Sequence, residues 1–448
     1  MPGFPSEAFT SWPVFTSCNG EGAPGAPPEE LIQYKKDIVE SYGEAAIRTS
    51  WLNVCKELEI LTDEISEKGT NIIPEVSYDE ILELSGDKKA ELQKRGCFVV
   101  RGVVSEDLAT KWYKDVKKYY EDNKSKVTGW PVATLFVLSL YWSPTQLSAR
   151  SHPRQLRLQR ELNSWWHDSP TSPTTSTDPL SYADAVRIRP PKIPFPGLGP
   201  HIDAGSLCRW VDPAYQGVYS EIFAGSPEKH DCYDIEKRKD AKQSIFGQSY
   251  NSSVLRAFQG WTTLTGAGKS EGSLVLYSDV KTSIAYILLR PFFKPPISTK
   301  EEDIMDASKW IFEISDPWFP GTFRNDSQYA SPSSHPHLRM TECMFNIPRM
   351  IPGDTVWWHC DMLHAVEVEH FGEFDASVAY IAATPTTELN KSYMREQVKA
   401  FLDGGKVPKD FEKDAGPQRY ECNFVGWGGE DAILSGEEGR RAAGLVGL

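Results

Sequence analysis

The strongest constraint on how this chain folds is a pair of polar motifs that lie far apart in the sequence. The first is His201-Ile202-Asp203, in which one residue separates two potential metal ligands. A strand would place His201 and Asp203 on the same face, with Cα atoms roughly 6.6 Å apart. The second is His364, which follows a strand-like run at residues 355–358. If the three side chains meet, an early strand must lie beside a late one.

Two imidazoles and one carboxylate on one side of an ion form the facial triad of non-haem iron(II) oxygenases, which leaves coordination positions open. An isolated His-x-Asp is a weak signal. It gains weight here because a turn at residues 352–354 and a strand-like segment precede the later histidine. We therefore predict that His201, Asp203 and His364 hold iron(II) and form the catalytic centre.

Other histidines compete for the third ligand position. His359 lies five residues before His364, and we expect it to pack beside the site rather than bind the ion. His335 and His337 have the spacing of neighbours on one strand face, but they follow a Ser- and Pro-rich stretch at residues 331–334 that is typical of a loop. We do not expect these two to be ligands.

Composition indicates an ordinary globular protein with enough material for a large core, because 40% of the 448 residues are hydrophobic and 25% are charged. Acidic residues outnumber basic ones by 62 to 48, and the net charge of −14 argues against a nucleic-acid partner. The start of the chain does not resemble a secretory signal, and the most apolar run, residues 132–142, is about half of the ~20 residues that a membrane span needs. The eight cysteines include no C-x-x-C pair. We expect a soluble, cytoplasmic protein that acts on a small molecule, while its oligomeric state is not readable from the sequence.

The N-terminal part is predicted to be helical. Residues 1–28 are interpreted as an irregular arm, residues 28–68 have the apolar spacing of helices, and residues 77–84 indicate a short helix. Together they form a predicted N-terminal unit, residues 1–90, that packs on the core. A strand is expected within residues 94–104, followed by a helix that Ser105 caps.

The rest of the chain, residues 91–448, is predicted to be one unit with a loop insertion near residues 143–180 and a C-terminal helical extension. A strand is expected at 182–189. Later short apolar runs predict strands at 254–258, 262–264, 273–277, 285–289, 343–347, 355–358 and 378–382, and helices at 212–224 and 388–402. Many short strands in a mixed chain favour an α+β fold with a sheet-on-sheet barrel or jelly roll and helices outside it.

Several segments also resemble known families. Residues 353–364, GDTVWWHCDMLH, resemble the distal-histidine segment of the phytanoyl-CoA hydroxylase type of iron(II)/2-oxoglutarate dioxygenases, and residues 92–104 resemble the entry strand of that group. Residues 182–191, 199–216 and 258–262 are more specifically similar to domain of unknown function 1479, a bacterial and fungal family. The resemblance covers roughly residues 90–425. It implies a double-stranded β-helix (a cupin-like jelly roll) that binds Fe(II) through the same three residues and uses 2-oxoglutarate and O2.

The sequence departs from the hydroxylase pattern at one position. That pattern places an arginine about eleven residues beyond the distal histidine, where it binds the far carboxylate of 2-oxoglutarate. This chain has Asp375 there, and no Arg or Lys lies between His364 and Asn390. Arg209 is the first candidate for the missing role, because a strand continuing from His201 would aim it inward, and a guanidinium matches a carboxylate in two hydrogen bonds. Arg395, on the expected helix after the last strand, is the second.

Two further arginines, Arg187 and Arg189, share a face of the preceding strand and could contact either the co-substrate or the substrate. With the family resemblance they favour a small carboxylate or amino acid as substrate, and hydroxylation, desaturation or oxidative cyclisation as the reaction. Two alternatives stay open. The missing arginine is compatible with an iron oxidase that needs no 2-oxoglutarate, and the motif could also persist in a catalytically silent jelly-roll binding protein.

Overall fold

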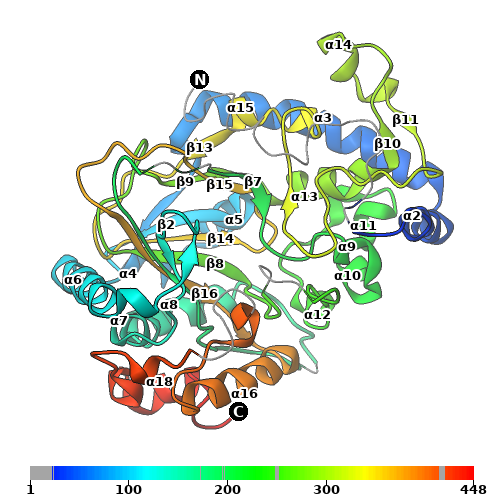
Figure 1. Ribbon diagram of the computed structural model, residues 1–448. Coiled ribbons are helices and arrows are strands. Elements are labelled where there is room, and N and C mark those ends of the chain that lie inside the picture. Colours follow the sequence, from blue (N-terminus) through cyan, green and yellow to red (C-terminus); the bar gives the residue numbers. More distant parts are fainter. Residues whose placement is uncertain are drawn as a thin grey trace.

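The structure is a computed structural model that describes residues 23, 25–171, 173–193, 195, 197–247, 252–412 and 419–448. Most of the predicted N-terminal arm, residues 1–22 and 24, therefore lies outside the described residues. The predicted α+β class is confirmed, because two mainly antiparallel sheets lie in the middle of the molecule and helices surround them (Figure 1). Among the helices of the described ranges, none is both long and apolar enough to cross a membrane.

The larger sheet has eight strands in the order β1-β2-β14-β8-β16-β6-β4-β3. Its strands are β1 (Glu75–Ser77), β2 (Cys97–Arg101), β3 (Gly129–Trp130), β4 (Val137–Leu138), β6 (Val186–Arg189), β8 (Phe258–Thr263), β14 (Thr355–His359) and β16 (Ala376–Ala383). Of these pairings only β1 with β2 is parallel. Every residue of the central strand β8 is buried, so both faces of this sheet are covered.

The smaller sheet has five strands in the order β12-β7-β15-β9-β13. These are β7 (Leu198–Ile202), β9 (Leu274–Tyr277), β12 (Gln328–Tyr329), β13 (Met344–Asn346) and β15 (His364–Val366). Along the chain, β6 to β9 alternate between the larger and the smaller sheet, and β13 to β16 alternate again. The sheets face each other, since the ring of Trp358 in β14 lies 5.2 Å from that of His364 in β15.

The N-terminal helices are α2 (Pro28–Tyr42) and α3 (Glu44–Lys68), as the sequence predicted. The long helix α3 lies on the side of the smaller sheet, next to α13 (Val280–Leu289) (Figure 1). It buries apolar residues spaced three or four apart, from Trp51 to Ile65, which is the stripe that a core-facing helix requires. Trp51 stacks on Tyr286 of α13, with ring centroids 5.4 Å apart.

A second group of helices lies on the side of the larger sheet (Figure 1). It includes α6 (Glu106–Asn123), α7 (Pro144–Arg150), α8 (Pro153–Asn163), α16 (Glu388–Leu402) and α18 (Gly436–Ala442). Helices α7 and α8 contact β16 directly. Ser105 caps α6 as predicted, because its Oγ accepts a hydrogen bond from the Leu108 amide.

The remaining elements are short. The helices are α4 (Tyr78–Ile81), α5 (Gly86–Arg95), α9 (Cys208–Val211), α10 (Pro213–Val218), α11 (Ser220–Phe223), α12 (Ile235–Arg238), α14 (Glu301–Ile304) and α15 (Met340–Cys343). The strands are β5 (Ser176–Pro179), β10 (Phe293–Lys294), β11 (Ile311–Phe312) and β17 (Pro385–Thr386). Ser77 caps α4 with a capping box, which agrees with the helix predicted at residues 77–84.

Several predicted elements differ from the structure. The strand predicted at 285–289 is wrong, because those residues end α13, a helix that is apolar all round and therefore shows no amphipathic period. The strand predicted at 254–258 is mostly the loop before β8, and β8 itself (Phe258–Thr263) takes the place of the strand predicted at 262–264. The strand predicted at 182–189 is the shorter β6. The helix predicted at 212–224 is two short helices, α10 and α11. Residues 143–180, expected to be a loop, contain α7, α8 and β5.

Candidate metal centre

The two predicted histidine ligands come from neighbouring strands of the smaller sheet. His364, at the start of β15, is the direct antiparallel partner of His201 in β7. Cross-strand partners place their side chains on the same face of a sheet, and the two imidazole rings lie 4.3 Å apart between centroids. Both residues are buried. The fold thus brings together two side chains that are far apart in the sequence.

Asp203 completes the group from the turn that follows β7. Its Oδ1 atom lies 3.2 Å from Nε2 of His201 and 3.5 Å from Nε2 of His364. Ligands bound at about 2.0–2.2 Å to one ion have donor atoms about 3 Å apart when they meet at right angles, so these separations fit a shared metal. The Ser327 hydroxyl donates a hydrogen bond of 3.1 Å to the backbone carbonyl of Asp203 and so fixes the turn.

Hydrogen bonds fix the tautomer of both histidines. Nδ1 of His201 lies 2.7 Å from the carbonyl oxygen of Gly199, and Nδ1 of His364 lies 2.9 Å from that of Met362. Because a carbonyl oxygen can only accept, each Nδ1 must carry the hydrogen. Each Nε2 therefore keeps its lone pair and points it toward Asp203, which is the state in which histidine binds a metal.

The charges in this group favour metal binding. Burial raises the pKa of Asp203, but the two neighbouring imidazoles outweigh it and hold the pKa well below its ordinary value. Burial and the nearby His201 lower the pKa of His364. For His201, burial lowers the pKa, but Asp203 outweighs burial and the net pKa is raised. The centre at neutral pH thus contains an ionised carboxylate beside an imidazole that resists protonation.

The face of the larger sheet that is turned toward this centre carries polar groups without partners. Strand pairing places Trp358, Tyr380 and Arg187 on that face. Trp358 pairs with Gln259 of β8, Tyr380 pairs with Trp261 two residues further along β8, and Arg187 pairs with Val378 two residues before Tyr380. Arg187 is 4% exposed, and among the described residues its side chain makes no ion pair and its Nε no hydrogen bond. Nε1 of Trp358 is also a buried donor without a hydrogen-bond partner in the described part of the chain. Buried donors of this kind indicate a place for a ligand that accepts hydrogen bonds.

Arg189 lies on the same strand face as Arg187, but both of its terminal guanidinium nitrogens donate hydrogen bonds within the protein. Its guanidinium donates to the backbone carbonyls of Glu367 and Val368 and lies over the ring of Phe195, 4.8 Å from the centroid. Gly272 provides the space, since a Cβ there would come within 2.9 Å of Nη1. Arg189 therefore holds the loop after β15 in place.

Arg209 is not on a continuing strand, as the sequence analysis expected. The chain turns after Asp203, with positive φ at Gly205 and Ser206, and Arg209 lies in the short helix α9. Its guanidinium is fully buried, 3.5 Å from Oδ1 of Asp361. Arg238 forms a closer ion pair with the same carboxylate. Arg209 is thus part of a buried cluster of two guanidiniums around one acid.

The other predicted anchor positions lie away from the centre. Arg395 is exposed on α16. Asp375, which stands where the hydroxylase pattern has an arginine, accepts hydrogen bonds from Nζ of Lys117 at 2.6 Å and the hydroxyl of Tyr113 at 2.7 Å, both on α6. These contacts draw the Asp375 carboxylate toward α6.

The rival histidines have packing roles. His359 stacks on Trp166 with ring centroids 4.9 Å apart, and its Nε2 donates a hydrogen bond of 2.9 Å to the carbonyl of Cys232. His359, Cys360 and Asp361 lie close enough to hold a metal, but Asp361 is already paired with Arg238. His337 is buried beside α3 and α13, with Nδ1 2.9 Å from the Tyr286 hydroxyl.

Sequence reasoning missed two charged residues beside the triad. Nη2 of Arg256 lies 3.6 Å from Oδ2 of Asp203, and Nη1 lies 3.6 Å from Oδ2 of Asp184. Both residues lie in segments that were predicted to be strands, residues 182–189 and 254–258. Arg256 lies outside every motif noted in the sequence, and Asp184 lies in a segment noted only for its family resemblance, so the packing of the loop before β8 against the turn after β7 is what reveals their place beside the triad.

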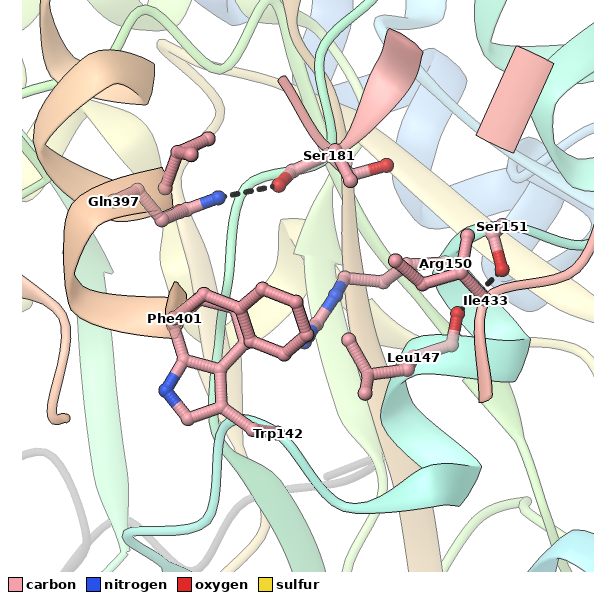
Figure 2. Close-up of a pocket in the computed structure, with 10 residues that line it drawn as sticks. Trp142, Leu147, Arg150, Ser151, Ser181, Gln397, Phe401 and Ile433 are labelled. Carbon is pink, nitrogen blue, oxygen red and sulfur yellow. Dashed lines mark hydrogen bonds between the residues drawn. The ribbon is translucent and has the colours of Figure 1, made fainter. Parts of the chain in front are cut away.

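Cavities elsewhere in the molecule are not associated with the triad. A cavity of about 20 Å³ lies between α7 and α16, where Arg150, Trp142 and Phe401 are among its walls (Figure 2). A water needs roughly 10–15 Å³, so this space suits a water rather than a substrate. A wider cleft of about 680 Å³ is lined by residues such as Arg101 and His152, beside the turn after β2. The donor geometry, and not a cavity, identifies the candidate site.

Comparisons with known proteins agree with the predicted family. The sequence matches the Gig2-like family over residues 27–445, so this chain belongs to that family. It is 28% identical over 377 residues to the uncharacterised protein YbiU of Escherichia coli K12, covering 81% of this chain and 83% of YbiU. The structure of GlcNAc Inducible Gene 2, GIG2 (DUF1479), from Candida albicans is similar with a TM-score of 0.83 and 26% identity, covering 95% of this chain and 91% of GIG2.

A proposed oxidoreductase from Salmonella typhimurium LT2 is also similar, with a TM-score of 0.76 and 28% identity, covering 96% of this chain and 100% of that one. The resemblance to domain of unknown function 1479 that residues 182–262 indicated is therefore confirmed.

Proposed function

We propose that this protein is an iron(II)- and 2-oxoglutarate-dependent oxygenase. The observation that carries the proposal is the convergence of two imidazole Nε2 atoms on one oxygen of Asp203, while hydrogen bonds to carbonyls occupy both Nδ1 atoms. This donor set, two neutral imidazoles and one carboxylate on one side of a site, is the set that binds non-haem iron(II). His201, Asp203 and His364 are the proposed ligands.

The fold supports the same class. Two facing sheets between which successive strands alternate, with an early strand paired to a late one, support the proposal of a jelly roll of the double-stranded β-helix type. This is the fold expected from the resemblance to the phytanoyl-CoA hydroxylase type. The similar Salmonella protein is described as a proposed oxidoreductase, which supports an oxidative function for this chain as well.

Arg187 is the proposed anchor for the distal carboxylate of 2-oxoglutarate. It lies on β6, beside the first half of β16, so a neighbouring strand supplies the cation that the Asp375 position lacks. It is buried on the face toward the triad, and its side chain has no ion-pair partner among the described residues. A buried guanidinium without a partner is costly, and a carboxylate that accepts two hydrogen bonds from it would remove that cost.

Iron with 2-oxoglutarate would supply an oxidant strong enough for a C–H bond of a small organic substrate, and the protein supplies binding, orientation and shielding. The triad residues would hold the ion, Arg187 would orient the co-substrate, and the buried Trp358 beside His364 would exclude water. A carboxylate or amino-acid substrate remains part of the proposal. Of the two arginines first considered for it, Arg189 is engaged in internal contacts. Arg209, first considered as the anchor of 2-oxoglutarate, lies beside Asp361.

The test is an anaerobic titration with Fe(II) of the wild type and of the variants His201→Ala and His364→Ala. We expect one iron per chain in the wild type and weak or no binding in both variants. Unchanged iron stoichiometry in both would end the proposal. A decarboxylation assay with 2-oxoglutarate and a panel of amino acids and organic acids then tests the co-substrate. Substrate-dependent oxygen uptake without succinate would favour the oxidase alternative, and iron retention without oxygen uptake would favour a binding protein.

A further inference from the structure

Asp203 has a different partner on each of its two oxygens. Oδ1 faces the imidazoles of His201 and His364, at 3.2 and 3.5 Å. Oδ2 faces the guanidinium of Arg256, whose Nη2 lies 3.6 Å away. The same guanidinium reaches a second acid through its other nitrogen, since Nη1 lies 3.6 Å from Oδ2 of Asp184. One cation therefore stands between a proposed metal ligand and a carboxylate that is not one.

The backbone that carries Arg256 is tightly held. The amide side chain of Asn390 in α16 clamps Leu255, accepting from its N–H at 2.9 Å and donating to its carbonyl at 3.1 Å. Asp410 accepts a hydrogen bond of 2.9 Å from the N–H of Ser253. The Arg256 side chain is only 13% exposed, and its guanidinium lies 5.7 Å from the ring centroid of Tyr182. The loop thus presents this side chain in one place, which is what a residue that orients a metal ligand requires.

Asp184 is a potential ligand that the structure keeps outside the triad. Its side chain is 17% exposed, and its Oδ1 accepts a hydrogen bond of 2.7 Å from the N–H of Ala185. The Gln146 amide donates to its backbone carbonyl at 2.8 Å. Burial raises the pKa of Asp184, and the charge of Arg256 acts against that rise. Asp184 and Asp203 are near enough to repel each other, and Arg256 compensates both.

We propose that Arg256 is a positioning residue that limits the metal centre to one carboxylate ligand. This inference rests on the proposed iron site. By pairing with Oδ2, the guanidinium leaves Oδ1 as the single ligand atom of Asp203, and by pairing with Asp184 it keeps a second carboxylate away from the ion. The coordination positions that an oxygenase needs for its co-substrate and oxygen then stay open.

The proposal predicts that loss of Arg256 makes the site bind a divalent cation more tightly. In Arg256→Gln, a positive charge near the ion is lost and Asp184 is released, and both changes attract a divalent cation. Co(II), a stable probe for the iron site, should bind about tenfold more tightly to Arg256→Gln than to the wild type. Its visible absorption spectrum should change as well, because a ligand is added. Arg256→Lys, which keeps the charge, should resemble the wild type.

The double variant Arg256→Gln/Asp184→Asn is the decisive control, because it removes the carboxylate that Arg256 holds back. Both the affinity and the spectrum should return toward those of the wild type. Arg349→Gln, which removes an exposed arginine paired with Glu271, should change neither. Circular dichroism of each variant shows that the fold is intact.

Co(II) binding to Arg256→Gln that is unchanged or weaker would overturn the proposal. So would a tighter affinity that persists when Asp184 is also replaced. Failure of the proposed metal site itself has a different signature, because His201→Ala would then bind Co(II) as well as the wild type does. The two failures are therefore distinguishable in one series of titrations.

Discussion

His201 and His364 are direct cross-strand partners in the antiparallel pair of β7 and β15. This pairing separates His364 from its neighbour in sequence, His359, whose Nε2 is committed to the carbonyl of Cys232 and whose ring stacks on Trp166. The two histidines should therefore respond differently to substitution.

We expect His359→Gln to keep full iron stoichiometry while it lowers stability by about 1–3 kcal/mol, because a buried hydrogen bond and a stacking contact are disturbed. Iron titration and thermal unfolding measure the two effects. His364→Ala, measured in parallel, should lose iron. Loss of iron in His359→Gln with retained fold would show that the third ligand has been misassigned.

Arg187→Gln should weaken the binding of 2-oxoglutarate by tenfold or more, on the order of the 1.5–3 kcal/mol of a hydrogen bond to a charged group. Iron binding should not change, because among the described residues no ion pair joins Arg187 to the triad. Calorimetry of the anaerobic iron-loaded protein measures the affinity. Arg187→Lys should be intermediate, since it keeps the charge and loses the fork. Arg395→Gln is the matched control on an exposed surface, and an equal loss there would contradict the assignment.

The turn before β14 depends on a glycine. Gly353 has a φ of +94°, and a Cβ at this position would lie 2.1 Å from the backbone oxygen of Val104. Gly353→Ala should therefore destabilise the protein by roughly 2–4 kcal/mol, since both the backbone conformation and the close contact are affected. Gly86→Ala in α5 is the control, because open space surrounds that position and alanine suits a helix. Equal unfolding temperatures for the two variants would refute the expectation.

A buried lysine makes the stability of the protein depend on pH in the alkaline range. Lys35 of α2 is fully buried, 3.2 Å from Asp316, and burial lowers its pKa to about 8. Between that value and the ordinary 10.5, the unfolded chain binds a proton that the folded chain has released, so stability rises with pH in this window. The rise should total about 3 kcal/mol.

Lys35→Met should remove this contribution, because Asp316 keeps its ion pair with Lys294. Denaturant unfolding of both proteins between pH 7.5 and 10.5 measures it. As the pH rises, the free energy of unfolding of the wild type should increase relative to that of Lys35→Met. A difference that does not vary with pH would contradict a depressed pKa at Lys35.

The sequence predicted the features that depend on local periodicity. The two-residue spacing of His201 and Asp203 predicted that they act together, although β7 ends at Ile202 and Asp203 lies in the turn after it rather than on the strand. β-Branched and aromatic runs located β9, β13, β14 and β16, and Ser77 and Ser105 marked two helix starts. These signals are carried by a few adjacent residues, so they survive without any knowledge of the tertiary structure.

The features that were wrong or missed depend on contacts between distant segments. The apolar run that ends α13 is buried on all sides, so apolar residues occupy every position. A short continuous apolar run is equally typical of a buried strand, and its sequence alone does not distinguish the two. Arg209 was placed inward because a strand was assumed to continue through Gly205, where the chain turns. Arg256 reaches Asp203 from a loop whose backbone is hydrogen-bonded to Asn390 and Asp410, and no local pattern encodes those contacts.

The pairing of β7 with β15 gives a bound ion a second consequence. Besides its chemical role, an ion bound by His201, Asp203 and His364 would be a removable cross-link between β7 and β15. The chain that connects these two strands includes the other three strands of the smaller sheet. Because the three ligands meet only in the folded chain, loading the site would stabilise the fold, and chelation would remove that stabilisation. The metal content of a preparation would consequently set its resistance to heat and to proteases, independently of any turnover.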